Sequence, residues 1–159
     1  MTAARKLCTF HLGGLLFGIA AEQVQEVLRP LPITPLPLAP PDVAGLINLR
    51  GQIVPALDMR RVLKLEPAPA GSDRFSVVAH TPQGPVSLQV DEIGDVMELD
   101  AAAGEPPPRN VDPDIGGLVR GVFPLKDRLL LVLDTARVTE IVPAARGAAN
   151  RSQNDAKTE

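Results

Sequence analysis

The chain has 159 residues, enough for one compact domain or for two small ones that share a core. Its hydrophobic fraction of 45% excludes a disordered chain, and 17 prolines with 13 glycines indicate many turns. The net charge of −3, the lack of a cluster of Lys and Arg, and the absence of Trp and Tyr argue against nucleic acid as a partner.

The first predicted element is a β-hairpin at the N-terminus. Apolar residues alternate on both sides of Gly13-Gly14: Phe10, Leu12, Phe17 and Ile19. A secretory signal is the alternative, because Arg5-Lys6 precedes an apolar run. His11 and the glycine pair interrupt that run, and the alternation favours the hairpin. No run in the sequence approaches the roughly 18 apolar residues of a membrane span.

Ten short strands follow from the alternation of apolar residues between turns. In chain order they are Lys6–Leu12, Leu15–Ile19, Val24–Leu28, Gly45–Leu49, Ile53–Leu57, Phe75–His80, Val86–Gln89, Asp95–Leu99, Leu118–Phe123 and Leu129–Leu133. Asp58 and Asp134 each follow a strand and are placed to cap a short helical turn. Pro-rich segments at Pro30–Pro41 and Pro106–Pro113 lie outside the sheets, because proline lacks a donor. Many short strands predict an all-β fold of small barrels.

A repeat relates the two halves of the chain. GLINLRGQIVPALDMRRV (45–62) returns as GLVRGVFPLKDRLLLVLDTARV (117–138), so the sequence pairs Gly45 with Gly117 and Leu57 with Leu133. Upstream, four residues match residues 69 positions later (86 − 17, 88 − 19, 93 − 24, 96 − 27): Phe17, Ile19, Val24 and Val27 match Val86, Leu88, Ile93 and Val96. The offset then grows to 72 (117 − 45) and 76 (133 − 57), as loop insertions in a duplicated unit would produce.

The C-terminal composition predicts a disordered tail, and the single cysteine bears on the cellular compartment. Residues 144–159 carry Ala, Gly, Asn, Ser and charge without periodicity, which predicts a disordered C-terminal tail. Cys8 has no partner for an internal disulfide, so nothing in the sequence requires an oxidising compartment. We therefore expect a cytoplasmic protein.

Residues for metal binding or catalysis are few. His11, His80 and Cys8 do not make up the four ligands of a structural zinc site, so we expect no metal and no cofactor. No Gly-rich phosphate loop and no G-x-S-x-G nucleophile motif occur. The remaining candidates for acid–base chemistry are four carboxylates, Asp91, Glu92, Asp95 and Glu98. A small hydrolase that uses this cluster is the alternative to a binding protein, although alternate strand positions usually form a solvated face.

Two long motif runs resemble a known family. The first half contains F-G-I, V-Q-E-V, I-T-P-L-P and V-A-G-L-I-N-L-R-G-Q-I-V-P, followed by L-D-M-R. The second half contains V-D-E-I-G-D-V at Val90–Val96, a P-P-P stretch and the closing V-R-G and L-V-L-D. Over Lys6–Ile141 this order resembles the CheW family of bacterial chemotaxis coupling proteins.

The resemblance implies a fold and a function. The fold would be two five-stranded SH3-like barrels related by a pseudo-twofold axis, interleaved in one domain over residues 1–143, with halves at about 6–66 and 73–141. Family members have no catalytic activity and no direct membrane insertion. They couple the cytoplasmic tips of chemoreceptors to the regulatory domain of a CheA-type histidine kinase. A generic SH3-like module for proline-rich ligands is a further possibility, but this sequence lacks the aromatic residues of such a groove.

The resemblance also assigns binding residues. Val24 and Glu26 of V-Q-E-V and Arg50 of N-L-R-G match positions linked to receptor binding, and an apolar groove between the barrels is expected to accept a receptor helix. Each residue has an alternative role: Val24 in the core, Glu26 on a solvated strand face, and Arg50 paired with Asp58 or Asp134. Gly51 is expected to form a turn.

One position departs from the family pattern. After the second Pro-rich stretch, family members often present a bulky apolar residue near a charged pair for packing on the kinase domain. This chain has Glu105, Arg109 and Asn110 there. Glu105 and Arg109 are the candidates for kinase binding, and the missing apolar anchor puts packing into extended arrays in question.

Overall fold

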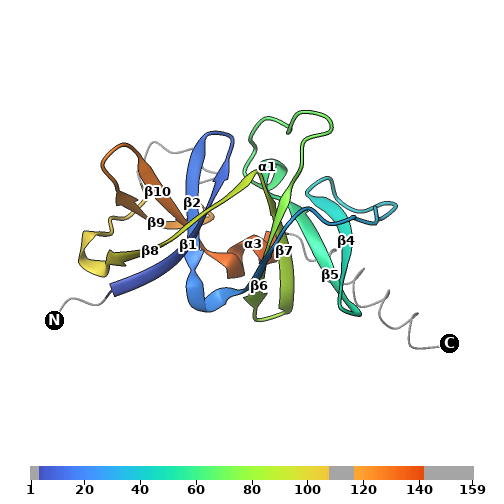
Figure 1. Cartoon of the computed structure of the whole chain (residues 1–159), viewed down its shortest axis with the longest axis horizontal. Helices are drawn as coiled ribbons and strands as arrows, with labels where there is room; N and C mark the ends of the chain where they lie inside the picture. The colour runs from blue at the N-terminus through green and yellow to red at the C-terminus, as the bar shows by residue number, and fades with distance from the viewer. Residues whose placement is uncertain (1–3, 108–116, 142–159) are drawn as a thin grey trace.

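The computed structural model describes residues 4–107 and 117–141, and in this part of the chain ten strands form two five-stranded sheets (Figure 1). Sheet A has the order β8-β1-β2-β10-β9, with β8 Glu92–Asp100, β1 Ala4–Leu12, β2 Leu15–Ala20, β10 Leu129–Leu133 and β9 Val119–Pro124. Sheet B has the order β3-β6-β7-β5-β4, with β3 Val24–Leu28, β6 Phe75–Thr81, β7 Gly84–Val90, β5 Gln52–Asp58 and β4 Val43–Leu49. The predicted all-β fold is confirmed.

Each sheet combines strands from both halves of the chain. If each strand is exchanged for its counterpart in the other half (β1 for β6, β2 for β7 and so on to β5 for β10), the strand order of sheet A becomes that of sheet B. This exchange is the pseudo-twofold relation. The described chain passes from sheet A to sheet B after β2, through the short 3-10 helix η1 (Ala21–Gln23), and returns at Asp91 between β7 and β8. Sheet A therefore consists of two strands from the first half and three from the second.

Each sheet closes into a barrel through one backbone pair. In sheet B, Thr34 and Leu46 exchange two N–H···O bonds of 2.8 Å, which join the segment after β3 to the opposite edge strand β4. In sheet A, Glu105 and Val122 exchange the same two bonds, also of 2.8 Å, and join the segment after the 3-10 helix η2 (Ala101–Ala103) to β9. We call the closed sheets barrel A and barrel B.

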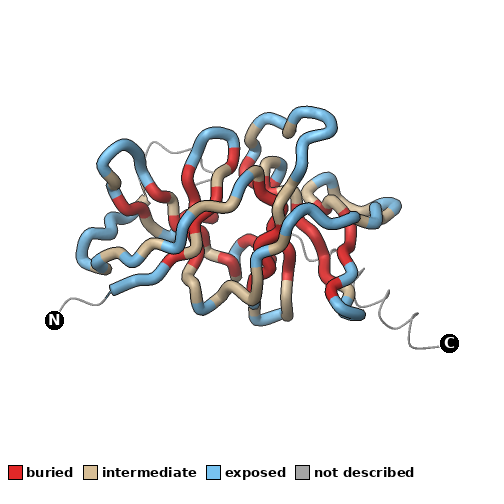
Figure 2. The backbone as a smooth tube through the Cα atoms, viewed as in Figure 1, coloured by how far each residue is buried: buried red, intermediate tan, exposed pale blue. Residues whose placement is uncertain are grey.

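The largest apolar cluster lies between the two barrels, and Figure 2 shows the buried backbone concentrated toward the middle of the molecule. Phe10 and Phe17 from sheet A are fully buried in it, with ring centroids 6.0 Å apart, and Val77 and Leu88 from sheet B belong to the same cluster. Each sheet also has a smaller buried cluster of its own. That of sheet A consists of Leu7, Leu16, Phe123, Leu130 and Val132. That of sheet B consists of Ile47, Leu49, Val54, Ala56 and Val78. Burial of this central surface joins the barrels.

The two predicted helical turns are present and both are capped by Asp. Asp58 accepts a bond of 3.1 Å from the Arg60 N–H at the start of α1 (Met59–Val62). Asp134 accepts bonds of 3.1 and 3.3 Å from the N–H groups of Ala136 and Arg137 at the start of α3 (Thr135–Ile141). Each carboxylate thus satisfies N–H groups that a helix start leaves unpaired.

The structure corrects the alignment of the repeat. The matching bridges pair Leu46 with Val122, so the counterpart of Gly45 is Gly121 and not Gly117. The offset is therefore 76 (122 − 46) already in β4 and β9, as it is at Leu57 and Leu133, and the insertion precedes β9. The Arg-Gly pair present in both repeated sequences does not occupy the same place in the structure: Arg120-Gly121 lies within β9, whereas Arg50-Gly51 lies in a turn.

Arg109, Asn110 and the proposed tail at 144–159 lie outside the described residues. Within residues 4–107 and 117–141, no helix has the length and apolar character needed to cross a membrane.

Candidate functional site

Glu26 and Arg50 form an ion pair at one end of barrel B. Glu26 lies on β3, which is an edge strand of sheet B, and Arg50 lies in the turn between β4 and β5. Arg50 Nη1 donates to Glu26 Oε1 at 3.1 Å, and Nη2 donates to Oε2, so the contact is bidentate. The Glu26 side chain is 22% exposed and that of Arg50 is 69% exposed. The paired charges are therefore open to a partner.

The turn that carries Arg50 requires an unusual backbone. Leu49 and Gln52 pair across the hairpin, so Arg50 and Gly51 are its two central residues. Their φ angles are 51° and 89°, both positive, as in the turns that match the twist of a hairpin. Gly51 also donates its N–H to Asn48 Oδ1 at 2.8 Å. The turn therefore holds the Arg50 side chain at the end of the barrel.

Each partner stabilises the charged form of the other. The hydrogen bond from Arg50 has the largest effect on the pKa of Glu26 and lowers it; burial opposes this, and the charge of Arg50 lowers the pKa further, so that it lies below the usual value. The hydrogen bond and charge of Glu26 raise the pKa of Arg50. Both groups are thus ionised at neutral pH, and the alternative pairing of Arg50 with Asp58 or Asp134 is not observed. Asp58 lies 3.5 Å from Arg74, and Asp134 lies 3.8 Å from Arg137.

Two valines of β3 flank Glu26. Val24 is half-buried and packs against the central cluster, whereas Val27 is 42% exposed. Val24 thus contributes to the core and remains partly accessible. The central cluster fills the space between the barrels with fully buried side chains such as Phe17 and Leu88, and the apolar groove expected there stays a prediction.

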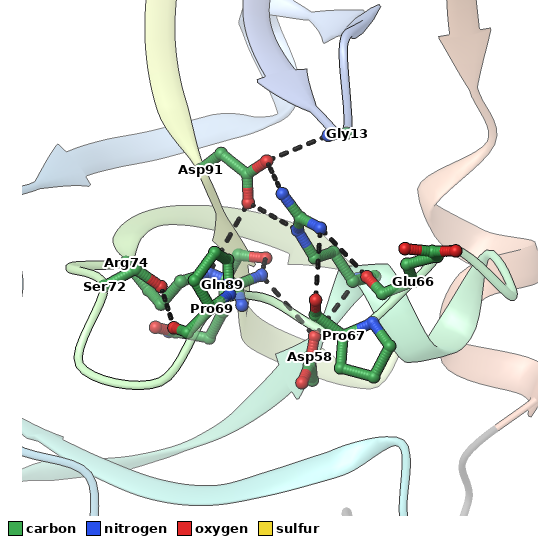
Figure 3. A network of polar contacts seen from close by, with 10 residues as sticks. Gly13, Asp58, Glu66, Pro67, Pro69, Ser72, Arg74, Gln89 and Asp91 are labelled. Carbon is green, nitrogen blue, oxygen red and sulfur yellow. Dashed lines mark hydrogen bonds and ion pairs between the residues drawn. The ribbon is translucent and has the colours of Figure 1, made fainter.

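A second polar cluster lies where the chain returns from sheet B to sheet A (Figure 3). Arg60 Nε donates to Asp91 Oδ1 at 2.9 Å and Nη2 donates to Oδ2 at 2.7 Å. The N–H of Gly13, in the turn between β1 and β2, donates to Asp91 Oδ2 at 2.8 Å. Arg74 Nε lies 3.7 Å from Asp91 Oδ1. Asp91 therefore ties α1, which follows β5 of barrel B, to a turn of barrel A.

The pKa of Asp91 reflects this environment. Partial burial by itself raises the pKa, but the hydrogen bonds from Arg60 and Gly13, with the charges of Arg60 and Arg74, outweigh it and lower the pKa below its usual value. A carboxylate held ionised by two arginines and a backbone N–H is a poor general acid. Its role is structural.

The hydrolase alternative finds no support in this geometry. Asp91 is engaged by Arg60, while Glu92, Asp95 and Glu98 are exposed along β8, an edge strand of sheet A. Within residues 4–107 and 117–141, no group of three or more His, Cys, Asp or Glu side chains is arranged to hold a metal ion.

Glu105 is exposed, and its backbone closes barrel A through Val122. The sequence analysis missed the structural role of Arg60 and Asp91. The two residues lie 31 positions apart in the chain, and no local periodicity links an Asp after one strand to an Arg in a distant helix. The family motif V-D-E-I-G-D-V includes Asp91 and was the available signal.

The comparisons with known proteins agree with one another. A model of the CheW-like domain matches residues 6–142. The chain is 28% identical to the chemotaxis protein CheW of Rhizobium meliloti, over 82% of this chain and 84% of that protein, and 28% identical to that of Bacillus subtilis, over 85% and 86%. The crystal structure of the scaffolding protein TtCheW from Thermoanaerobacter tengcongensis superposes with a TM-score of 0.78 at 26% identity, covering 88% of this chain and 94% of that one.

The family model covers most of the chain, and the solved relative shares its double-barrel architecture. The chain therefore belongs to the CheW-like family of chemotaxis coupling proteins, and its role is that of a non-catalytic adaptor.

Proposed function

We propose that this adaptor binds the cytoplasmic tip of a chemoreceptor through the receptor edge, which we define as Val24, Glu26 and Val27 of β3 with Arg50 of the adjoining turn. The observation that carries the proposal is the exposed bidentate pair between Glu26 and Arg50. It presents two fixed charges beside an exposed valine on an edge strand.

This arrangement suits an amphipathic helix. A helix presents apolar side chains at i, i+3 and i+4, and these can cover Val27 and the accessible part of Val24. Polar side chains on its flanks can then contact Glu26 and Arg50 at the rim, where charges select orientation and partner more than they add affinity. The bidentate contact restricts the rotamers of Arg50 before binding, so less side-chain entropy is lost on association.

The second proposed partner is the regulatory domain of a CheA-type histidine kinase, contacted through barrel A near Glu105 and Arg109. Glu105 is exposed and follows η2 directly. Arg109 lies outside the described residues. We place this assembly in the cytoplasm, because both partners would be cytoplasmic and the single Cys8 requires no oxidising compartment.

The test of the receptor edge is charge reversal at Arg50. We expect Arg50→Asp to weaken binding of a receptor-tip helical hairpin at least about tenfold, because it places like charges on Glu26 and its neighbour. Aspartate tolerates positive φ better than most residues, so the turn should form. The melting temperature should stay near that of the unchanged protein, since exposed ion pairs contribute roughly 0–1 kcal/mol.

Arg61→Asp is the matched control, because Arg61 is an exposed arginine of α1 away from the receptor edge. It should bind the receptor fragment normally. Glu26→Lys should reduce receptor control of kinase autophosphorylation in a reconstituted complex without unfolding the chain. A large drop in melting temperature for Arg50→Asp, with receptor binding retained, would assign the pair a structural role and contradict the proposal.

A further inference from the structure

The open end of barrel A contains a cavity of about 440 Å³ whose counterpart in barrel B is the receptor edge. Its apolar lining includes Leu16, Met97 and Leu125, and its charged rim consists of Asp95, Lys126, Asp127 and Arg128. All four charged residues are exposed. The cavity lies between β8 and the turn that joins β9 to β10.

The strand on one side of this cavity matches β3 residue by residue. Ile93, Asp95 and Val96 of β8 lie 69 positions after Val24, Glu26 and Val27 (93 − 24, 95 − 26, 96 − 27). The pairing partners obey the same offset: Val24 pairs with Ala79 and Val27 with Val77, while Ile93 pairs with Phe10 and Val96 with Cys8. The pairing of β3 with β6 shifts register between Val24 and Glu26, and the pairing of β8 with β1 shifts at the corresponding place, between Phe10 and Cys8. Asp95 therefore occupies the place of Glu26.

The turn on the other side matches as well. The closing bridges align Leu46 with Val122, and three residues further on Leu49 aligns with Leu125. Leu49 pairs with Gln52 across Arg50-Gly51, and the Leu125 N–H donates to the Arg128 carbonyl at 2.8 Å across Lys126-Asp127. Lys126 therefore occupies the place of Arg50, so the acid on the strand and the base in the turn recur in barrel A.

The two ends differ in one respect. In barrel B, Glu26 and Arg50 contact each other. In barrel A, no ion pair joins Asp95 to Lys126 among the contacts of residues 4–107 and 117–141, and the cavity between them stays open. The valine beside the acid is also more exposed, at 60% for Val96 against 42% for Val27.

We propose that this end of barrel A is a second binding site for a receptor-tip helix, so that one adaptor holds two such helices through pseudo-twofold-related surfaces. The inference rests on the proposed role of the receptor edge. A helix whose charges complement Glu26 and Arg50 also complements Asp95 and Lys126, because the signs and backbone positions are the same. An apolar side chain of that helix enters the cavity over Leu16 and Met97.

The test is a calorimetric titration of the full-length chain with a receptor-tip helical hairpin. The unchanged protein should bind two hairpins per chain, and Lys126→Asp and Asp95→Lys should each reduce this to one. Lys64→Asp is the matched control, because Lys64 is exposed and does not line the cavity, and it should still bind two. Circular dichroism should show that every variant is folded.

The receptor edge is tested separately by Arg50→Asp, which should leave one hairpin bound at barrel A, while the double variant with Lys126→Asp should bind none. A single hairpin per chain that Arg50→Asp removes would overturn the second site and leave the receptor edge intact. Two hairpins that persist in Arg50→Asp would instead contradict the receptor edge. Loss of the kinase regulatory domain in Lys126→Asp, with both hairpins retained, would also overturn the inference.

Discussion

At the scale of single residues, Asp91 belongs to neither proposed binding surface, but we expect it to contribute strongly to the stability of the fold. Asp91 accepts hydrogen bonds from Arg60 on α1 and from Gly13 on barrel A, at the point where the chain crosses between the sheets (Figure 3). Its side chain is 21% exposed and that of Arg60 is 15% exposed. Because both side chains are largely shielded from solvent, removal of one charge leaves the other without its partner and destabilises the fold.

We expect Asp91→Asn to lower the free energy of unfolding by about 2 kcal/mol at neutral pH, because it removes charge-assisted hydrogen bonds and leaves Arg60 without its carboxylate. The loss should depend on pH. The pKa of Asp91 in the folded chain lies below its ordinary value of 3.8, so its stabilisation is present above that value and is lost as the pH falls through the folded pKa. Denaturant titrations at about pH 7 and about pH 2.5 measure the difference between the two proteins.

Glu92→Gln is the control, because Glu92 is the exposed neighbour of Asp91. It should change the free energy of unfolding by less than about 0.5 kcal/mol at either pH. A difference between unchanged and Asp91→Asn protein that grows on acidification would show that the sign of the pKa shift is wrong.

Single residues also show where sequence reasoning stops. Glu26 and Arg50 were identified through a family motif, but their contact with each other was not predicted, and the alternative role considered for Arg50 was a pair with Asp58 or Asp134. A guanidinium reaches whichever carboxylate the barrel places near it. That placement depends on the closure of β4 onto the segment after β3, which leaves no periodic signal in the sequence.

At the scale of elements, two glycines illustrate two kinds of constraint. Gly45 has a φ of 150°, and a Cβ there would overlap the Thr34 backbone, with the Ile33 Cγ2 atom also only 2.8 Å away. Gly51 has a φ of 89°, but nothing lies within 4 Å of its missing Cβ. Gly45 therefore permits closure of barrel B, whereas Gly51 supplies only a turn conformation.

We expect Gly51→Ala to cost about 1 kcal/mol, the penalty of a left-handed conformation with a Cβ. Gly45→Ala should cost more, about 3 kcal/mol or above, because the backbone of Thr34 must move and its pair with Leu46 is disturbed. Chemical denaturation of both variants gives the ranking. Gly51→Asn should recover part of the loss, since Asn tolerates positive φ. Equal costs for the two alanine variants would mean that the contact with Thr34 is not essential for closure.

At the scale of the whole molecule, alternation predicted the strands well but not their partners. The predicted Val24–Leu28 and Leu129–Leu133 agree with β3 and β10, and both Asp caps are present, because these features depend on neighbouring residues. The exchange of strands between halves depends on contacts between distant segments. It reached the sequence analysis only through the family resemblance.

The interleaved sheets imply that neither half is an independent folding unit. A fragment of residues 1–70 contains β1 and β2 without β8 and β10, and β3 to β5 without β6 and β7. Each sheet would expose unpaired edges, and the central cluster would lose the residues that the other half contributes, such as Val77 and Leu88. We expect fragments 1–70 and 71–159 each to be unfolded alone, by circular dichroism and by the dispersion of amide NMR signals.

Mixing the two fragments should restore the spectrum of the intact chain, because all ten strands are then present and the break falls in the exposed segment between α1 and β6. The control is the intact protein cleaved in the same segment after folding, which should keep its spectrum. If fragment 71–159 folded alone with dispersed signals, five strands of one half would suffice for a stable sheet. The adaptor would then consist of two separable modules, and movement of one barrel relative to the other would need to break only their shared core.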